Sequence, residues 1–239
     1  MNIWQQMWAI ITAPGGVYQS YAWDSIKLSL VAIVLAFVIA TPLGMLVARQ
    51  PIAAFIAANL SGVLRAIPIL AFLAVAIDYL GTGFKPSLVA LVITGVPPIL
   101  LNTIAGFQGI DPALLDAAKG LGMTRWQTLL RVEAPLTLPS VAAGMRTSAV
   151  QIIATAALAA LIGGGGWGVY ILDGDYHLND AELFVGAGSF ILLAFAAEFA
   201  LAGVQRLVTP RGVLVAQARP DEALDLASAP ATEPTTQAA

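Results

Sequence analysis

The chain has 239 residues, of which 59% are hydrophobic and only 10% are charged, with a net charge of −3 at pH 7. A soluble domain carries about 25% charged residues, so this composition excludes an ordinary soluble protein, and the small net charge argues against nucleic-acid binding. The chain has no cysteine and a single histidine, His177, which excludes disulfides, a thiolate or histidine metal cluster and a catalytic triad. We therefore expect an integral membrane protein without catalytic residues, a metal site or a cofactor.

Residues 1–24 form an aromatic N-terminal segment that lacks the basic region and the continuous apolar run of a signal peptide. Its aromatic side chains are Trp4, Trp8, Tyr18, Tyr21 and Trp23. Tryptophan and tyrosine concentrate where lipid headgroups meet water, so we expect an interfacial helix on the extracytoplasmic side, before the first span.

Five apolar blocks are long enough to cross a membrane, which takes about 20 residues for a hydrocarbon core of about 30 Å. They are Leu28–Ala48, Ile52–Ile77, Pro86–Phe107, Leu138–Ile162 and Leu183–Val204. Only helices and closed barrels satisfy the backbone in lipid, and the blocks lack the alternating pattern of barrel strands. The sequence therefore predicts an all-α, polytopic membrane protein with about five transmembrane helices over residues 25–208.

The distribution of basic residues predicts how these spans are oriented. If the five spans alternate, Lys27 and Lys85 fall on one side, and the other side carries Arg49, Lys119, Arg125, Arg131, Arg206 and Arg211. Cytoplasmic loops are enriched in Lys and Arg, so we expect the N-terminus outside and the C-terminus in the cytoplasm. Residues 209–239 are rich in Ala, Pro and Thr and are predicted to form a disordered cytoplasmic tail.

The longest polar connection, Asp111–Pro139, lies between the third and fourth blocks. Asp111, followed by proline, is a helix-start signal. Gly122 permits a sharp turn with positive φ, and a second short helix, Arg125–Val132, is expected to end at Pro135. Two short helices broken by glycine predict a compact cytoplasmic knob; the alternative is a connection that only reverses the chain at the membrane surface.

The knob carries a spaced motif: DAA at 116–118, three residues, Gly, nine residues, and then VEAP at 132–135. This pattern resembles the cytoplasmic loop Glu-Ala-Ala-x3-Gly-x9-Ile-x-Leu-Pro that marks the permeases of binding-protein-dependent ABC importers. Asp, Val and Ala replace Glu, Ile and Leu at positions 116, 132 and 134. The candidate ATPase-coupling residues are Asp116, Ala117, Ala118, Gly122, Val132 and Pro135.

The resemblance extends beyond the loop, over about Ser25 to Gly168. Four segments resemble the permeases of osmoprotectant importers, which carry glycine betaine, carnitine or choline: Thr41–Arg49, Leu64–Ala74, Pro97–Thr124 and Gly144–Gly168. Permeases of methionine importers share the five-span plan and a similar loop, so an importer of methionine or another amino acid is the alternative.

The resemblance implies the type I ABC importer permease fold in a bacterial plasma (inner) membrane. It also implies a homodimer or a pair with a sister permease, two ATPase subunits on the cytoplasmic side and an extracytoplasmic substrate-binding protein. In this family the loop rests in a cleft of the ATPase, with the position of Asp116 as its anchor. The chain has no Gly-x4-Gly-Lys-Ser/Thr phosphate loop, since the run Gly163–Gly166 lacks the lysine. We therefore expect ATP hydrolysis on the partner, and membrane lipids but no nucleic acid among the other partners.

Charged residues inside the apolar blocks are costly unless they face protein or water. Three interpretations of Arg65, three residues before Pro68, stay open: it lines the pathway or a gate, pairs with Glu198, or marks an early cytoplasmic end of its helix. Arg146 lies near one end of its block and is expected to extend to the cytoplasmic side.

Further gate candidates lie at the predicted outer mouth. Gly163 and Gly164 suggest close packing or a hinge, and Trp167 is expected to cluster with Tyr170 and Tyr176. Such aromatics form either a cage for a quaternary ammonium group or a headgroup belt. Rival functions are a secondary transporter, an intramembrane enzyme and a structural subunit. Five unequal spans with Glu198 as the lone acidic candidate argue against the first.

Overall fold

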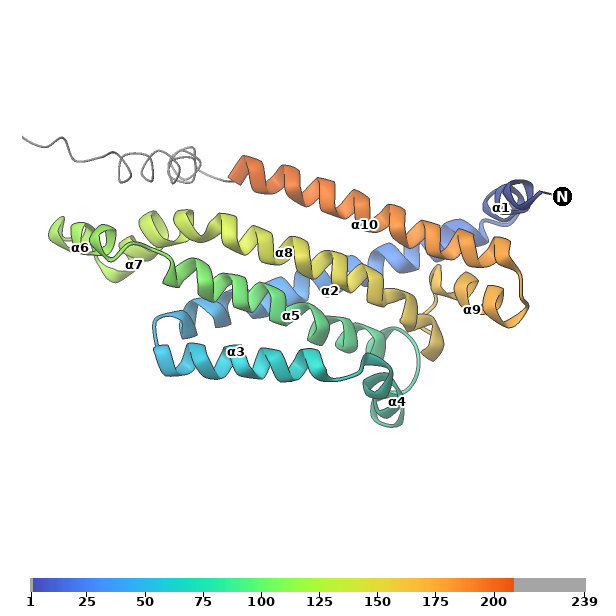
Figure 1. Ribbon diagram of the computed structural model, residues 1–239, viewed down its shortest axis with the longest axis horizontal. Helices are drawn as coiled ribbons and strands as arrows, with labels where there is room; N and C mark the ends of the chain where they lie inside the picture. Colours follow the sequence, from blue (N-terminus) through green and yellow to red (C-terminus); the bar gives the residue numbers. More distant parts are fainter. Residues whose placement is uncertain (1, 209–239) are drawn as a thin grey trace, which may run out of the picture.

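The computed structural model describes residues 2–208, and this part of the chain is built from helices without strands (Figure 1). A π-helical turn, Leu129–Glu133, precedes α8, and a 3-10 segment, Ala157–Ile162, follows it. The α-helices are α1 (Ile3–Ile11), α2 (Val17–Ala48), α3 (Pro51–Ala66), α4 (Ile69–Leu80), α5 (Phe84–Gln108), α6 (Pro112–Gly120), α7 (Arg125–Thr128), α8 (Ala134–Ala156), α9 (Gly168–Tyr176) and α10 (Asp180–Val208).

Four helical segments are long and apolar enough to cross a membrane, or five if the bent pair α3–α4 counts as one span. This agrees with the predicted all-α membrane fold of about five spans. The predicted tail, residues 209–239, lies outside the described residues.

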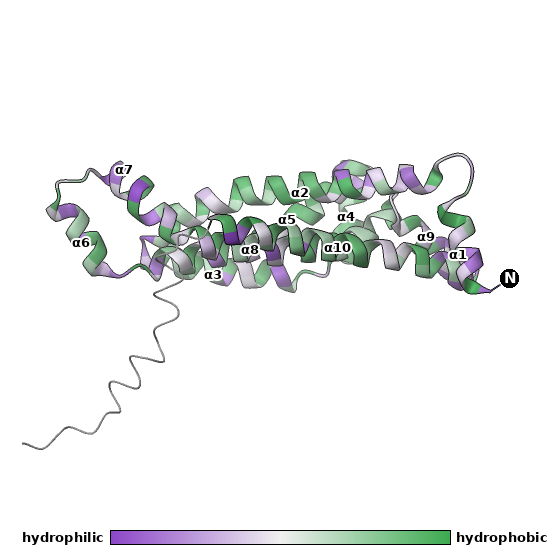
Figure 2. Cartoon of the chain, turned by 90° about the horizontal axis from the view of Figure 1, so that it is seen from above, coloured by the Kyte–Doolittle hydropathy of each residue, from purple (hydrophilic) through white to green (hydrophobic). Residues whose placement is uncertain are grey.

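The long helices run along one axis, with α6 and α7 at one end of it and α1 and α9 at the other (Figure 1). We call the end with α6 and α7 the loop end and the end with α1 and α9 the opposite end. Hydrophobic residues cover the spans between them, and hydrophilic residues gather at the ends (Figure 2). The predicted N-terminal helix is present as α1, where Trp4 is 75% and Trp8 is 68% exposed.

Small residues bring α2, α5 and α8 into close contact. A Cβ added at Gly44 of α2 would lie 2.7 Å from the side chain of Thr103 on α5. A Cβ at Gly95 of α5 would lie 2.5 Å from Ile152 on α8, and the Ser148 hydroxyl of α8 donates a hydrogen bond of 2.8 Å to the Gly95 carbonyl. Glycine, alanine and serine allow membrane helices to approach closely enough for extensive van der Waals contact. These three helices form the core of the bundle.

The second predicted span is broken rather than continuous. Helices α3 and α4 meet at an angle of 86°, and the two residues between them, Ile67 and Pro68, have extended backbones with ψ of 118° and 119°. Proline has no N–H for the helix ladder and disfavours helical geometry at the residue before it. The span is therefore fully broken at Pro68, and α4 turns away from the bundle axis (Figure 1).

The prediction that Pro135 ends the second knob helix is wrong. From α7 the chain continues through the π-helical turn directly into α8, and Pro135 lies in the first turn of α8. A first-turn amide has no partner within its own helix, so proline is tolerated there. The knob is consequently joined to the fourth span by continuous helical backbone.

Candidate functional site

The knob begins with the predicted cap. Asp111 precedes α6 in a non-helical conformation, and its Oδ1 accepts a 2.8 Å hydrogen bond from the backbone N–H of Ala113. Proline occupies the first helical position, where its missing N–H costs nothing. The start of α6 is thus fixed by its own sequence.

The turn between α6 and α7 depends on Gly122, which has the expected positive φ, at +73°. Its N–H donates to the Lys119 carbonyl at 2.9 Å, and the N–H of Met123 donates to the Ala118 carbonyl at 3.1 Å. This pair of hydrogen bonds is the Schellman motif, which ends a helix with a left-handed residue, usually glycine. Gly120, two residues earlier, is the last residue of α6.

Helix α7 starts with a capping box. The Thr124 hydroxyl accepts from the N–H of Gln127 at 3.3 Å, while the Gln127 side chain accepts from the N–H of Thr124 at 2.8 Å. Reciprocal caps of this kind satisfy amides that a short helix leaves free. Both knob helices are therefore held by local hydrogen bonds, which a bare linker would not need.

The knob exposes an apolar surface at the loop end. Its exposed apolar side chains are Leu114, Leu121, Trp126 and Leu130, with Leu121 at 82% and Trp126 at 72% exposure. Among the candidate coupling residues, Asp116 and Ala117 are exposed, whereas Ala118 is buried. The Asp116 carboxylate accepts from Lys119 at 2.8 Å in an exposed pair, which contributes little stability. Exposed apolar residues gathered in this way are typical of a surface that contacts another protein or a membrane.

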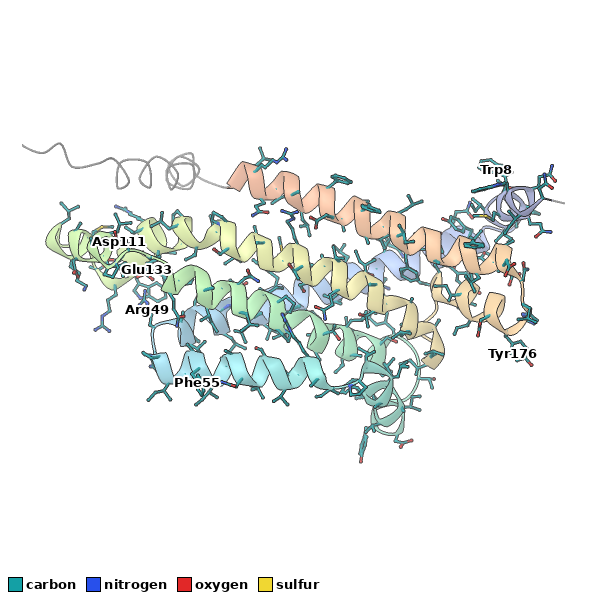
Figure 3. The ribbon with its side chains drawn as sticks, viewed as in Figure 1. Trp8, Arg49, Phe55, Asp111, Glu133 and Tyr176 are labelled. Atoms are coloured by element: carbon teal, nitrogen blue, oxygen red, sulfur yellow. The ribbon has the colours of Figure 1, made fainter. Side chains whose placement is uncertain are left out.

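An ion pair that sequence reasoning missed joins the base of the knob to α2. Nη2 of Arg49, the residue that follows α2, donates to both carboxylate oxygens of Glu133, at 2.8 and 2.7 Å. Glu133 ends the π-helical turn and is 6% exposed, the lone charged residue among the buried side chains of the described chain. Figure 3 shows the two side chains together at the loop end. Both residues flank predicted spans at the same membrane face, and this shared position is the sequence signal that could have suggested the pair.

A cavity of about 220 Å³ lies between the knob and the bundle. Its charged lining residues are Arg49, Lys119, Arg125 and Glu133. Val132, another of the candidate coupling residues, is half-buried in the π-helical turn.

A second ion pair lies within the spans and differs from what the sequence suggested for Arg65 and for Arg146. The Arg146 guanidinium donates to Oε1 of Glu198 through Nε, at 3.0 Å, and through Nη2, and Nη1 donates to Gln205 at 2.7 Å. The proposed pair between Arg65 and Glu198 is therefore wrong, and Arg146 does not extend alone toward a membrane surface. Packing of α8 against α10 brings these residues together, at the edge of a cavity of about 550 Å³.

Arg65 lies in the last turn of α3, immediately before the break. Helix α3 starts next to Arg49 at the loop end and runs away from it, so Arg65, in its last turn, does not mark an early end on the loop side. It lines a cavity of about 250 Å³ between α3, α4, α5 and α8. The remaining interpretation, a residue of the pathway, is consistent with this position.

The aromatic residues at the opposite end pack together without forming an open cage. Trp167 is 7% exposed, with its ring 5.7 Å from that of Tyr18 and 5.9 Å from that of Phe190. Tyr170 packs against Tyr18 at a centroid distance of 6.4 Å. The expected membership of Tyr176 is wrong, because Tyr176 is 84% exposed and its ring contacts His177 (Figure 3). The cluster belongs to the core.

The glycine run that precedes Trp167 combines turn geometry with close packing. Gly163 has a φ of +74°, and a Cβ at Gly164 would lie 2.6 Å from the Ser87 hydroxyl and 2.7 Å from the Ala159 carbonyl. The expected close packing is confirmed. Within residues 2–208, no group of three or more His, Cys, Asp or Glu residues is placed to hold a metal ion.

Several known proteins align with this chain over most of its length. The glycine betaine/carnitine/choline transport system permease protein OpuCB of Bacillus subtilis is 38% identical over 208 residues, which cover 87% of this chain and 96% of the relative. The carnitine transport permease protein OpuCB of Listeria monocytogenes is 38% identical, covering 80% of this chain and 88% of the relative. The choline transport system permease protein OpuBB of Bacillus subtilis is also 38% identical, covering 82% and 90%.

The fold has a counterpart among solved structures. A chain of the MetNI methionine ABC transporter in an inward-facing conformation superposes with a TM-score of 0.73 at 20% identity, covering 81% of this chain and 97% of that one. The family described as "Binding-protein-dependent transport system inner membrane component" matches residues 40–211. With a knob at one end of a bundle of spans and this match over most of its length, the chain belongs to the family of inner membrane components of binding-protein-dependent transport systems.

Proposed function

We propose that this chain is the permease subunit of an ABC importer for a small osmoprotectant such as glycine betaine, choline or carnitine. The locally capped α6–α7 knob with its exposed apolar surface is the observation that carries the transport assignment. The substrate class is supported by relatives named for these compounds that are 38% identical over at least 80% of the chain. An importer of methionine is the weaker candidate, because the likeness to the methionine transporter is at 20% identity and concerns the fold.

In the proposed cycle a separate ATPase subunit binds the knob and hydrolyses ATP. Asp116 and Ala117 lie exposed on α6 where such a partner would dock, and Gly122 sets the angle between the two knob helices. Movement of the knob would pass to α8 through the continuous helical backbone. It would pass to α2 through the ion pair of Glu133 with Arg49.

The proposed assembly places the loop end in the cytoplasm and the opposite end outside, where a substrate-binding protein would dock. The N-terminus is then outside and the C-terminus cytoplasmic, as the Lys and Arg distribution indicates. A second copy of this chain or a sister permease completes the transmembrane unit. Residues 1–24 form the interfacial segment in this proposal, residues 25–208 the permease domain and residues 111–135 the coupling loop.

The proposed orientation can be tested by labelling, because the chain has no native cysteine. Leu121→Cys and Tyr176→Cys place single thiols at positions 82% and 84% exposed at the two ends of the molecule. In right-side-out membrane vesicles, we expect a membrane-impermeant maleimide to label Tyr176→Cys directly and Leu121→Cys only after permeabilisation. Labelling of both thiols from the same side would contradict five alternating spans.

The proposed substrate class can be tested in proteoliposomes that contain this chain with its cognate ATPase and binding protein. We expect ATP-dependent uptake of at least one of radiolabelled glycine betaine, carnitine and choline, since the relatives are named for these compounds. The same vesicles assayed without the binding protein are the control. Uptake of methionine together with no uptake of any quaternary amine would contradict the assignment.

The coupling role of the knob can be tested with two matched variants, Gly122→Val and Gly120→Val. A Cβ at either position meets no atom within 4 Å, but Gly122 alone of the two has positive φ. A non-glycine residue in that conformation costs about 1–2 kcal/mol, which corresponds to a factor of roughly 5–30 in an equilibrium. We expect Gly122→Val to reduce ATP-driven uptake by about this factor with assembly intact, while Gly120→Val stays near wild type.

Charge reversal at the proposed anchor, Asp116→Lys, should reduce uptake in the same assay. If both Gly122→Val and Asp116→Lys coupled ATP hydrolysis to uptake as the wild type does, the knob would be only a connection that reverses the chain.

The ion pair at the base of the knob generates a further prediction. Glu133→Gln leaves Arg49 facing a neutral partner. Removing one partner of a buried pair costs about 3–5 kcal/mol, but Arg49 is 47% exposed, so solvent screening reduces the expected loss to about 1–3 kcal/mol. We expect a melting temperature in detergent lower by several degrees and weaker stimulation of ATP hydrolysis by loaded binding protein.

The control for this prediction is the swapped pair, Arg49→Glu with Glu133→Arg, which restores opposite charges. We expect loaded binding protein to stimulate ATP hydrolysis more strongly in the swapped pair than in Glu133→Arg alone. If Glu133→Gln melted and coupled like the wild type, the ion pair would have no part in transmission.

A further inference from the structure

The cavity at the break between α3 and α4 combines a polar lining with an unpaired positive charge. Its volume is about 250 Å³, slightly below the 300–1,000 Å³ typical of sites for drug-sized ligands. It therefore suits a small molecule. Its polar lining side chains come from three helices and are Arg65, Thr94, Gln151 and Thr155.

Arg65 has no ion pair with any described residue. Arginine in the middle of a membrane span costs at least about 2.5 kcal/mol unless it meets water or an opposite charge. Glu198, which lies within α10, is already bound by Arg146. A second copy of this chain would bring another Glu198 that is held in the same way. Glu198 therefore does not supply a counter-ion to Arg65, whose side chain is left open to a ligand.

A polar stripe leads along α8 to this cavity. Thr147, Gln151 and Thr155 are spaced four residues apart, so they lie on one face of the helix. Gln151 lines both the Arg65 cavity and the larger cavity beside Arg146 and Glu198. Polar residues within a membrane span face a water-filled cavity or the bundle interior, and Gln151 is where this stripe joins the linings of the two cavities.

The helix break adds to the positive potential of the cavity. Ile69, the first residue of α4, lines it, and no side chain caps the first turn of α4. In transporters with broken spans, the N-termini of half-helices point at anionic groups of the substrate. The positive end of α4 and the Arg65 guanidinium thus favour the same kind of ligand.

We propose that this cavity is a carboxylate-binding subsite on the translocation pathway, in which the Arg65 guanidinium binds the carboxylate of a zwitterionic betaine. The inference rests on the proposed function and specifies its substrate within that class. Glycine betaine and carnitine carry a carboxylate beside their quaternary ammonium group, whereas choline carries a hydroxyl group instead. A guanidinium donates two parallel hydrogen bonds to a carboxylate, so the subsite favours the two zwitterions over choline.

The test compares Arg65→Gln with the wild type in proteoliposomes containing the complete transporter. Initial uptake of radiolabelled glycine betaine and choline is measured at saturating loaded binding protein, so that capture outside the membrane does not limit the rate. We expect Arg65→Gln to lower glycine betaine uptake at least tenfold and to leave choline uptake unchanged or raised. Arg65→Lys should recover part of the loss, because it keeps the charge without the two-pronged geometry. Arg206→Gln, the same substitution at an exposed residue near the end of α10, is the matched control.

A second measurement tests the subsite without transport. Thr155→Cys introduces a single thiol into the cavity, and its rates of reaction with an anionic and a cationic methanethiosulfonate are compared. We expect the anionic reagent to be favoured, and this preference to fall at least fivefold when Arg65→Gln is added.

The outcomes separate the inference from the proposed function. An equal fall in glycine betaine and choline uptake would show that Arg65 acts in gating or assembly, and would overturn the subsite. The subsite would also be overturned if Arg65→Gln took up glycine betaine as fast as the wild type. The same holds if Arg65→Gln left the reactivity of the Thr155→Cys thiol toward anionic and cationic reagents unchanged. If the wild type carried neither compound, the proposed function would fail, while the thiol measurement would still decide whether the cavity prefers anions.

Discussion

Helices α2, α5 and α8 approach one another so closely that an added Cβ at Gly44, Gly95 or Gly144 would lie within 3 Å of a neighbouring helix. In lipid the hydrophobic effect does little to hold helices together, so association depends on van der Waals contact and on hydrogen bonds between helices. The bond from Ser148 to the Gly95 carbonyl is one of these. The close contact makes three spans behave as one rigid unit, and the broken span and α10 are arranged around it.

This rigid unit gives the loop end its mechanical significance. The knob is attached at two points, by helical backbone to α8 and by the pair of Glu133 with Arg49 to α2. A π-helical turn, Leu129–Glu133, leads from the knob into both attachments, and such turns occur frequently at functional sites. A buried carboxylate is stable only when it is paired, so the pair resists separation of the knob from α2. Force applied at the knob in the proposed cycle would then act on the whole core.

Local sequence signals predicted much of this architecture. The apolar blocks gave the spans, and Asp111 and Gly122 gave the start and end of α6, because caps and left-handed turns depend on residues close together in the chain. Pairings between distant positions could not be obtained in this way. The pair of Glu198 with Arg65 was one of three open interpretations, and the pair with Arg146 was not foreseen. Helix rotation and depth in the bundle decide the partner, and they have no signature in one sequence. The error at Pro135 has another cause, since proline both ends helices and fits their first turn.

The connection between α2 and α3 consists of Arg49 and Gln50 alone. Arg49 therefore binds Glu133 while it forms half of the turn that leads into α3. Helix α3 has 16 residues and a length of about 24 Å, and Arg65 lies at its far end. Such a helix acts as a lever arm: a tilt of about 5° at its base would displace the guanidinium by roughly 2 Å over that length. The geometry thereby offers a mechanical link from the knob to the cavity at the helix break. A small tilt of α3 at one membrane face would move the guanidinium by a distance comparable to the length of a hydrogen bond.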